Sequence, residues 1–242
     1  DDLISGELIN NGIWEEKITE KYIKLLNKLD KDDLILDVGA NLGYYSIIAA
    51  SHGYEVYAFE PFETNYDKFY SSILLNSYYK NIKIFKNIVS NKSHEKKSLN
   101  IVPGPIVNYG CITVDDKEGN IETIAIDDLN IKKNIGILKI DVEGYEYEVI
   151  EGLKNLILNN QVKNIIIECS PKFRNIEYYF KIIKFLILNS YYIYDFDNNQ
   201  FTFEEFKNDL IKFDQGDYYF KKSDFIPIQC INLKNNIDRK NH

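Results

Sequence analysis

The sequence predicts an α/β fold, a mostly parallel sheet of seven strands flanked by helices, with a small β-hairpin insert. Short apolar or β-prone runs alternate with segments whose apolar residues recur at helical spacing, which is the pattern of repeated strand and helix units. Three of these runs end in carboxylates, Glu60, Asp141 and Glu168. The carboxyl ends of parallel strands form the edge at which ligands of open α/β folds bind, so we expect these groups to meet there.

Length and composition favour one folded domain. The chain has 242 residues, 45% of them hydrophobic and 27% charged, which is typical of a globular protein. We divide it into an N-terminal helical arm (1–31), a core (32–233) and a polar tail (234–242). The net charge is −8 without a long basic block, which disfavours a nucleic-acid partner and favours a neutral or weakly charged ligand.

The cysteines and the first residues of the sequence indicate in which cellular compartment we expect the protein. Cys111, Cys169 and Cys230 are scattered and show no CxxC spacing, so we expect buried free thiols in a reducing compartment and a cytoplasmic protein. No apolar run reaches bilayer length, and the start at Asp1 lacks a charged-then-apolar signal pattern. We therefore expect no membrane partner.

The N-terminal arm is expected to be helical and to pack on the edge of the core. Leu25, Leu26 and Leu29 lie on one helical face, with charges between them. Trp14 precedes them in a polar, glycine-containing loop. It suits either a hydrophobic plug that fixes the arm, which we favour, or a lid over the ligand, so we keep it as a candidate substrate contact.

The core opens with a strand (34–38), a glycine turn (39–43) and a helix start (44–50). Glycines allow close backbone approach and dihedrals that a Cβ forbids, while the amides of a helix N-terminus attract polar or anionic groups. A ligand is therefore expected at this turn. The turn alone does not identify the ligand.

The second strand (54–59) ends in Glu60-Pro61. An acidic residue about twenty residues past a glycine turn is placed to accept hydrogen bonds from the hydroxyls of a ribose, which favours a nucleoside ligand. A helix (65–76) and a third strand (82–89) follow, leading to Ser90. Residues 97–126 are then expected to form inserted hairpins. These hairpins either contact the substrate, with Asn108 and Tyr109 as candidate residues, or form a ribbon with a structural role only.

The fourth strand (135–141) is mostly apolar, as expected for a parallel strand buried on both faces. Its two-residue period places Lys139 and Asp141 on the same side. A helix follows, and the fifth strand (162–168) ends in Glu168. The remaining expected elements are a helix (176–189), a strand (191–196), a short helix (203–211) and a last strand (225–233).

These motifs together resemble the FkbM-type methyltransferases, which use S-adenosylmethionine on a class I Rossmann-like fold. The resemblance spans most of residues 12–170, and its most specific part is Leu138-Lys-Ile-Asp-Val-Glu-Gly144. It implies that four residues line the methionine part of the cofactor: Asp37, Gly39, Asn41 and Gly43. It also implies that Glu60, next to Pro61, holds the ribose and that Asn87 to Ser90 lie near adenine. Ser46 and Asn65 match polar positions of the family, although capping or packing explains each equally well.

Methyl transfer from a sulfonium is an in-line displacement, so the enzyme must chiefly align the acceptor oxygen, and a base is needed for a weakly acidic hydroxyl. Asp141 is the first candidate base, Glu168 the second and Glu143 the third. Lys139 is also a catalytic candidate, but a buried cation that neutralises Asp37 or Asp141 comes first. If Lys139 pairs with Asp141, that carboxylate is a weaker base, and Glu168 becomes a better candidate for the base.

No metal is predicted, because acidic residues on loops are usually solvated; a divalent cation held by clustered carboxylates is the alternative. The predicted function is S-adenosylmethionine-dependent O-methylation of a sugar, glycan or related small polyol. The alternatives are a methyltransferase for a protein side chain or lipid head group, and an inactive nucleoside-binding scaffold. A nicotinamide dehydrogenase is disfavoured because the turn lacks a third glycine at the right spacing. The sequence does not predict an oligomeric state.

Overall fold

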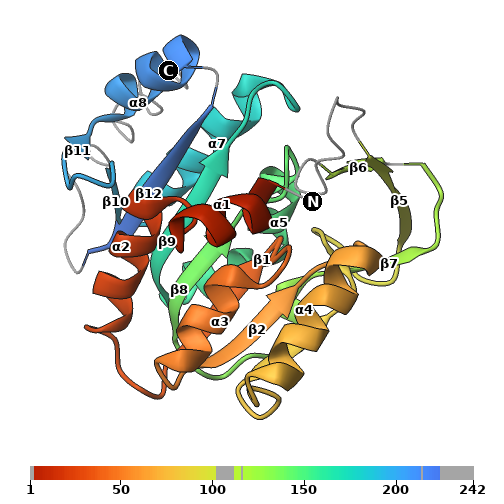
Figure 1. Cartoon of the computed structure of the whole chain (residues 1–242). Helices are drawn as coiled ribbons and strands as arrows, with labels where there is room; N and C mark the ends of the chain where they lie inside the picture. Colours follow the sequence, from red (N-terminus) through yellow and green to blue (C-terminus); the bar gives the residue numbers. More distant parts are fainter. Residues whose placement is uncertain (1–2, 102–111, 116, 214, 224–242) are drawn as a thin grey trace.

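A computed structural model describes residues 3–101, 112–115, 117–213 and 215–223. An eight-stranded sheet, here the central sheet, has the order β11-β10-β12-β9-β8-β1-β2-β3 (Figure 1). Its strands are β1 (Leu34–Val38), β2 (Glu55–Phe59), β3 (Ile82–Phe85), β8 (Ile135–Ile140), β9 (Val162–Cys169), β10 (Tyr191–Tyr194), β11 (Gln200–Phe201) and β12 (Gly216–Lys222). The five strands from β9 to β3 pair in parallel, whereas β12 pairs antiparallel with both β9 and β10.

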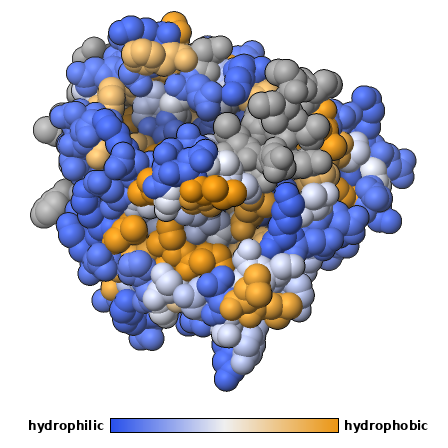
Figure 2. All heavy atoms as spheres, in the orientation of Figure 1, coloured by the Kyte–Doolittle hydropathy of each residue, from blue (hydrophilic) through white to orange (hydrophobic). Residues whose placement is uncertain are grey.

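Helices cover both faces of the central sheet (Figure 1). They are α1 (Leu3–Asn11), α2 (Glu16–Leu26), α3 (Tyr44–Ser51), α4 (Glu63–Leu75), the 3₁₀ helix η1 (Ile126–Leu129), α5 (Glu146–Gly152), α6 (Lys154–Leu158), α7 (Ile176–Leu188) and α8 (Phe203–Phe213). On the side shown in Figure 2, hydrophilic residues cover the region around α2, and hydrophobic residues gather near α3 and α4. Within the described residues, no helix has the length and apolar character needed to cross a membrane.

The alternation of side chains along each strand divides the core into two clusters. In β1, Leu34, Leu36 and Val38 belong to the cluster under α5 to α8, whereas Ile35 points to the cluster under α2 and α3. All five residues of β1 and all six of β8 are buried. Burial on both faces explains why these strands are so apolar in sequence.

A second sheet, here the insert sheet, has the order β4-β7-β5-β6. Its strands are β4 (Ile88–Val89), β5 (Lys96–Ile101), β6 (Ile112–Asp115) and β7 (Ile121–Ile124). Of the hairpins expected within 97–126, one is present, because β5 pairs antiparallel with β6, whereas β7 pairs with β5 and β4 instead of β6. In Figure 1 the insert sheet stands beside the central sheet, past the carboxyl ends of its parallel strands.

The predicted fold class is confirmed, with three differences in the elements and one expected element that the structure does not test. The expected arm helix is two helices, α1 and α2, joined at Trp14. The expected third strand (82–89) is divided, because β3 stays in the central sheet while β4 pairs with β7 in the insert sheet. The expected strand 225–233 lies outside the described residues. Strand β12, which the sequence analysis missed, lies between β9 and β10.

Candidate active site

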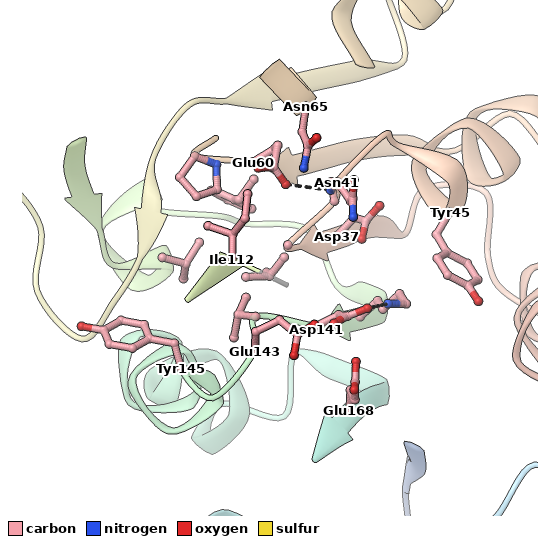
Figure 3. Close-up of a pocket in the computed structure, with 18 of the residues that line it drawn as sticks. Asp37, Asn41, Tyr45, Glu60, Asn65, Ile112, Asp141, Glu143, Tyr145 and Glu168 are labelled. Carbon is pink, nitrogen blue, oxygen red and sulfur yellow. Dashed lines mark hydrogen bonds and ion pairs between the residues drawn. The ribbon is translucent and has the colours of Figure 1, made fainter. Parts of the chain in front are cut away.

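A cavity of about 400 Å³ opens at the carboxyl ends of β1, β2 and β8, with Glu168 of β9 at one end (Figure 3). Three groups of residues form it. The glycine turn and Glu60 form the first, the carboxylates after β8 and β9 form the second, and the insert sheet forms the third with Leu99, Ile112 and Val114. The cavity therefore joins a polar nucleoside-type site to a cluster of acids beside an apolar surface.

The glycine turn has the backbone geometry that its sequence predicts. Gly39 has φ +81°, and a Cβ on it would lie 1.8 Å from the backbone oxygen of Asp141. Gly43 has φ +82°, and a Cβ there would lie 2.0 Å from the ring of Phe69. Only glycine accommodates both the positive φ and the close neighbours. The turn therefore holds the end of β1 close to the end of β8, next to the candidate base Asp141.

Asp37 lines the cavity from the end of β1 and is buried. Its Oδ2 accepts a hydrogen bond of 2.6 Å from the hydroxyl of Ser46, which is fully buried on α3. Burial raises the pKa of Asp37, while the charge of Lys139 and the bond from Ser46 oppose that rise. Ser46 is thus placed to orient Asp37, and it is not among the residues that line the cavity.

Glu60 is buried at the end of β2 and faces the turn (Figure 3). Its two oxygens accept hydrogen bonds from the backbone amides of Asn41 (2.8 Å) and Phe62 (2.9 Å). Burial raises the pKa of Glu60 to about 7, although both amide bonds favour the ionised form. These bonds fix the carboxylate against the glycine turn, and each oxygen keeps acceptor capacity for a further donor.

Buried Lys139 and partly buried Asp141 form an ion pair, with 2.9 Å between Nζ and Oδ2. Lys139 also lies opposite Asp37 in the parallel register of β1 and β8. Burial alone would lower the pKa of Lys139, but the carboxylates of Asp141, Glu15 and Asp37 hold it above its ordinary value. Burial would raise the pKa of Asp141, but Lys139 and a hydrogen bond with Glu168 keep it low. The lysine thus has the neutralising position that its spacing predicts, and Asp141 is ionised but a weak base.

Glu168 is held in one orientation beside Asp141. Its Oε1 accepts hydrogen bonds from the hydroxyl of Ser170, at 2.8 Å, and from the side-chain amide of Gln215. Burial, followed by the negative charge of Asp141, raises the pKa of Glu168 to about 10. At neutral pH Glu168 therefore carries a proton that it shares with ionised Asp141.

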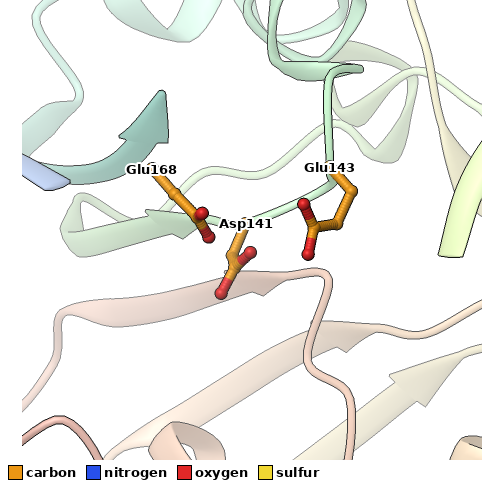
Figure 4. Close-up of side chains that lie close together, drawn as sticks. All are labelled: Asp141, Glu143 and Glu168. Carbon is orange, nitrogen blue, oxygen red and sulfur yellow. The ribbon is translucent and has the colours of Figure 1, made fainter. Parts of the chain in front are cut away.

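Asp141, Glu143 and Glu168 point toward one another (Figure 4), and one oxygen from each lies within 4.8 Å of the others. Such an oxygen cluster could hold a hard divalent cation. The other acids considered from the sequence act elsewhere: Asp115 pairs with Lys117, Asp127 accepts from the backbone of α6, and Asp128 accepts from Ser93. Asp116 lies outside the described residues.

The remaining predicted site residues are placed as follows. Asn41, Pro61, Asn65 and Asn87 line the cavity. Trp14 also lines it and at the same time packs against the core cluster under α2 and α3, and its contact with a substrate stays a prediction. Ser90 is fully buried and does not line the cavity; its backbone N–H donates to Ile124 of the insert sheet. Asn108 and Tyr109 lie outside the described residues.

The sequence analysis did not predict several residues that lie near the carboxylates of Asp141 and Glu168. Glu15 lines the cavity and accepts a 2.7 Å hydrogen bond from Tyr45, although only its neighbour Trp14 was singled out. Gln215 and Asp217 belong to the segment of the missed strand β12, and burial raises the pKa of Asp217 to about 7. The aromatic run Tyr218-Tyr-Phe220 was the sequence signal for that strand.

Comparisons with known proteins agree with this geometry. A family model described as the methyltransferase FkbM domain matches residues 37–214. Hexuronic acid methyltransferase AglP of Haloferax volcanii is 29% identical over 149 residues, which are 60% of this chain and 59% of that protein. The chain therefore matches less than two thirds of that relative's length.

One solved structure shows the same fold at low identity. A putative rRNA methylase from Clostridium thermocellum has a TM-score of 0.52 at 10% identity, covering 85% of this chain and 95% of its own. An FkbM methyltransferase from Methylobacillus flagellatus has a TM-score of 0.48 at 14% identity, covering 79% of this chain and 43% of its own. The family model spans well over half of the chain, from residue 37 near the end of β1 to residue 214 just before β12. The chain therefore belongs to the FkbM methyltransferase family.

Proposed function

We propose that this methyltransferase uses S-adenosylmethionine to methylate a hydroxyl of a sugar, glycan or related small polyol. One observation carries the proposal: a single cavity joins the glycine turn and Glu60 to the proton-sharing pair Asp141 and Glu168. The first part suits a nucleoside cofactor, and the second suits an acceptor that must lose a proton.

The residues at the turn fit this cofactor. A Cβ at Gly39 would occupy the space beside Asp141, so the close approach of turn and strand depends on glycine. The buried carboxylate of Glu60 is placed to accept from the hydroxyls of a ribose. When bound, S-adenosylmethionine supplies a methyl group already activated on a sulfonium. A cationic sulfonium also agrees with a cavity lined by acids rather than by phosphate-binding lysines.

The chain's own residues then orient the acceptor and take its proton. Asp141, fixed by Lys139 and Glu168, accepts a hydrogen bond from the acceptor hydroxyl. As the hydroxyl oxygen forms its new bond, its proton passes to the carboxylate pair. The side chains of Leu99, Ile112 and Val114 give the cavity an apolar wall. An apolar wall that excludes water strengthens the polar interactions inside a cavity.

Two observations support a sugar, glycan or related small polyol as the acceptor. The chain is acidic and its cavity presents few cations, which suits an uncharged hydroxyl compound better than a phosphorylated one. The matched relative from Haloferax volcanii is named for a sugar acid. Lipid head groups and protein side chains are the competing acceptors.

The test combines binding and transfer. Calorimetry should detect S-adenosylhomocysteine and not NAD, and labelled S-adenosylmethionine should then methylate members of a panel of nucleotide sugars and oligosaccharides. Heat with NAD but not with S-adenosylhomocysteine would reject the cofactor. Cofactor binding with transfer only to protein or lipid in the same panel would reject the acceptor class.

The proton on Glu168 predicts a pH dependence of transfer. Glu168 is protonated below its pKa of about 10, so raising the pH frees a second carboxylate at the acceptor. We expect kcat/KM to rise above neutral pH, with a slope approaching about tenfold per unit, and to level off near pH 10. Glutamine cannot lose a proton but can still donate to Asp141, so Glu168→Gln should give a flat profile.

The control for this profile is Glu204→Gln, because Glu204 is exposed on α8 and pairs with Lys207. It should keep the wild-type slope, and circular dichroism at each pH should confirm that the protein stays folded. A wild-type profile that is flat from pH 6 to 10 would mean that Asp141 acts without Glu168.

A further inference from the structure

A second concave surface lies away from the cavity, between α2, the start of β9 and the end of β12 (Figure 1). This groove has a volume of about 1270 Å³, and we call it the lysine groove. Seven lysines line it: Lys17, Lys21, Lys24, Lys28, Lys163, Lys221 and Lys222. Among the described residues that line it, only Glu20 and Asp197 are acidic, although the whole chain has a net charge of −8.

The lysine groove is separate from the catalytic cavity. Strand β9 begins at Val162 in the groove and reaches Glu168 at the cavity. Because a strand rises about 3.3 Å per residue, these two residues lie about 20 Å apart. A ligand in the groove therefore does not compete with the cofactor.

Three of the seven lysines have carboxylate partners. Lys17 pairs with Asp197, Lys24 with Glu20, and Lys163 with both Asp30 and Asp33, all at 2.8–2.9 Å. Among residues 3–101, 112–115, 117–213 and 215–223, no ion pair involves the other four, which are Lys21, Lys28, Lys221 and Lys222. The groove thus has an excess of positive charge.

Lys21 shows that this charge is built into the fold. Only 7% of the residue is exposed. Its ammonium donates to the side-chain oxygen of Asn198 and lies 4.2 Å from the ring centroid of Tyr219, and neither partner carries a full negative charge. Burial lowers the pKa of Lys21, and the charges of Lys28, Lys221 and Lys24 add to that effect, while the charge of Asp195 opposes it only in part. A bound anion would compensate a cation that otherwise destabilises the fold.

We propose that the lysine groove binds a ligand that carries two phosphate groups on an organic body. Lys17, Lys21 and Lys24 follow one face of α2, and Lys28 lies just past its end, while Lys221 and Lys222 approach from β12. A phosphate monoester carries about −1.5 to −2 charge at pH 7, so two phosphates match four uncompensated lysines better than one carboxylate does. Lysine binds phosphate as a point charge. Tyr194 and Phe196 line the same groove and offer apolar surface to the organic part.

The test uses the full chain and three probes: inorganic pyrophosphate, uridine diphosphate, and phosphatidylcholine vesicles with or without a phosphorylated lipid. We expect calorimetry or co-sedimentation to detect binding that weakens with added salt. Lys28→Glu with Lys221→Glu should weaken it about tenfold or more. Both lysines are exposed, as are Lys80 and Lys132, so Lys80→Glu with Lys132→Glu is the control with the same change in net charge.

The outcomes separate the sources of phosphate. Tighter binding of uridine diphosphate than of pyrophosphate supports a free nucleotide, and binding only to vesicles that contain the phosphorylated lipid supports a lipid head group. Absence of binding to all three probes, equal weakening in the control pair, or binding to an oligonucleotide alone would overturn the proposal. S-adenosylhomocysteine affinity should be unchanged in both double variants, so this result is independent of the proposed methyl transfer.

Lys21→Met provides a second measurement. If Lys21 serves ligand binding, the variant should bind the probes more weakly while its thermal midpoint without ligand stays the same or rises, because a buried cation has been removed. A lower midpoint with unchanged binding would assign Lys21 a structural role and overturn its part in the site.

Discussion

Asp141→Asn is expected to lower kcat/KM by about 10²- to 10⁴-fold, the range that a positioned general base contributes. Asparagine keeps the shape of the side chain but cannot accept a proton. It also leaves the buried ammonium of Lys139 without its 2.9 Å partner. Steady-state kinetics with the acceptor identified in the transfer assay would measure the loss. Activity within about threefold of wild type would show that Asp141 is not the base.

Stability must be separated from chemistry in this variant. Removing one partner of a buried ion pair costs about 3–5 kcal/mol, so the free energy of unfolding should fall as well. Asp141→Asn combined with Lys139→Met removes both charges and should recover much of that stability without recovering activity. The control is Asp128→Asn, since Asp128 is exposed on η1 and accepts from Ser93. Recovery of activity in the double variant would mean that the pair is structural only.

Gly39→Ala is expected to abolish binding of S-adenosylhomocysteine and to lower the free energy of unfolding by about 3 kcal/mol or more. The new Cβ would lie 1.8 Å from the backbone oxygen of Asp141, in a residue with φ +81°. The end of β8 must move to relieve this contact. Chemical denaturation and calorimetry would measure the two effects.

Gly53→Ala is the matched control for the turn. Gly53 has φ +86°, but nothing lies within 4 Å of its Cβ position. The free energy of unfolding of Gly53→Ala should fall by only about 1–2 kcal/mol, the cost of placing alanine in the left-handed region. The variant should keep its affinity for S-adenosylhomocysteine. Similar losses in both variants would show that backbone strain, and not the approach of the turn to Asp141, accounts for the effect at Gly39.

Most of the parallel half of the fold was predictable because its strands have clear sequence signals, although the end of β3 was not. β1 and β8 are continuous apolar runs that end in a glycine turn or a carboxylate, and their alternation assigns side chains to the two faces. The same alternation placed Lys139 and Asp141 on one side, and the structure pairs them. The family match also extends beyond the resemblance noted up to residue 170, reaching residue 214.

The antiparallel edge and the insert were harder to predict because their pairing is non-local. β12 comes last among the described strands but lies between β9 and β10, and no local signal fixes that position. Its segment brings Gln215 to Glu168 across 47 residues of sequence. Glu15 likewise reaches Tyr45 from the arm. The pKa values at the acidic end depend on such contacts, and spacing along the chain does not reveal them.

The insert sheet gives the active site a modular construction. In the described part of the chain its strands pair only with one another, so the two sheets share no ladder. Leu99, Ile112 and Val114 therefore contact the cavity from a scaffold whose hydrogen bonds are independent of those that hold the glycine turn. Substitutions on these strands can reshape this apolar wall of the cavity while the hydrogen bonds of the glycine turn stay intact. A family can thus keep the turn and vary the wall that faces it.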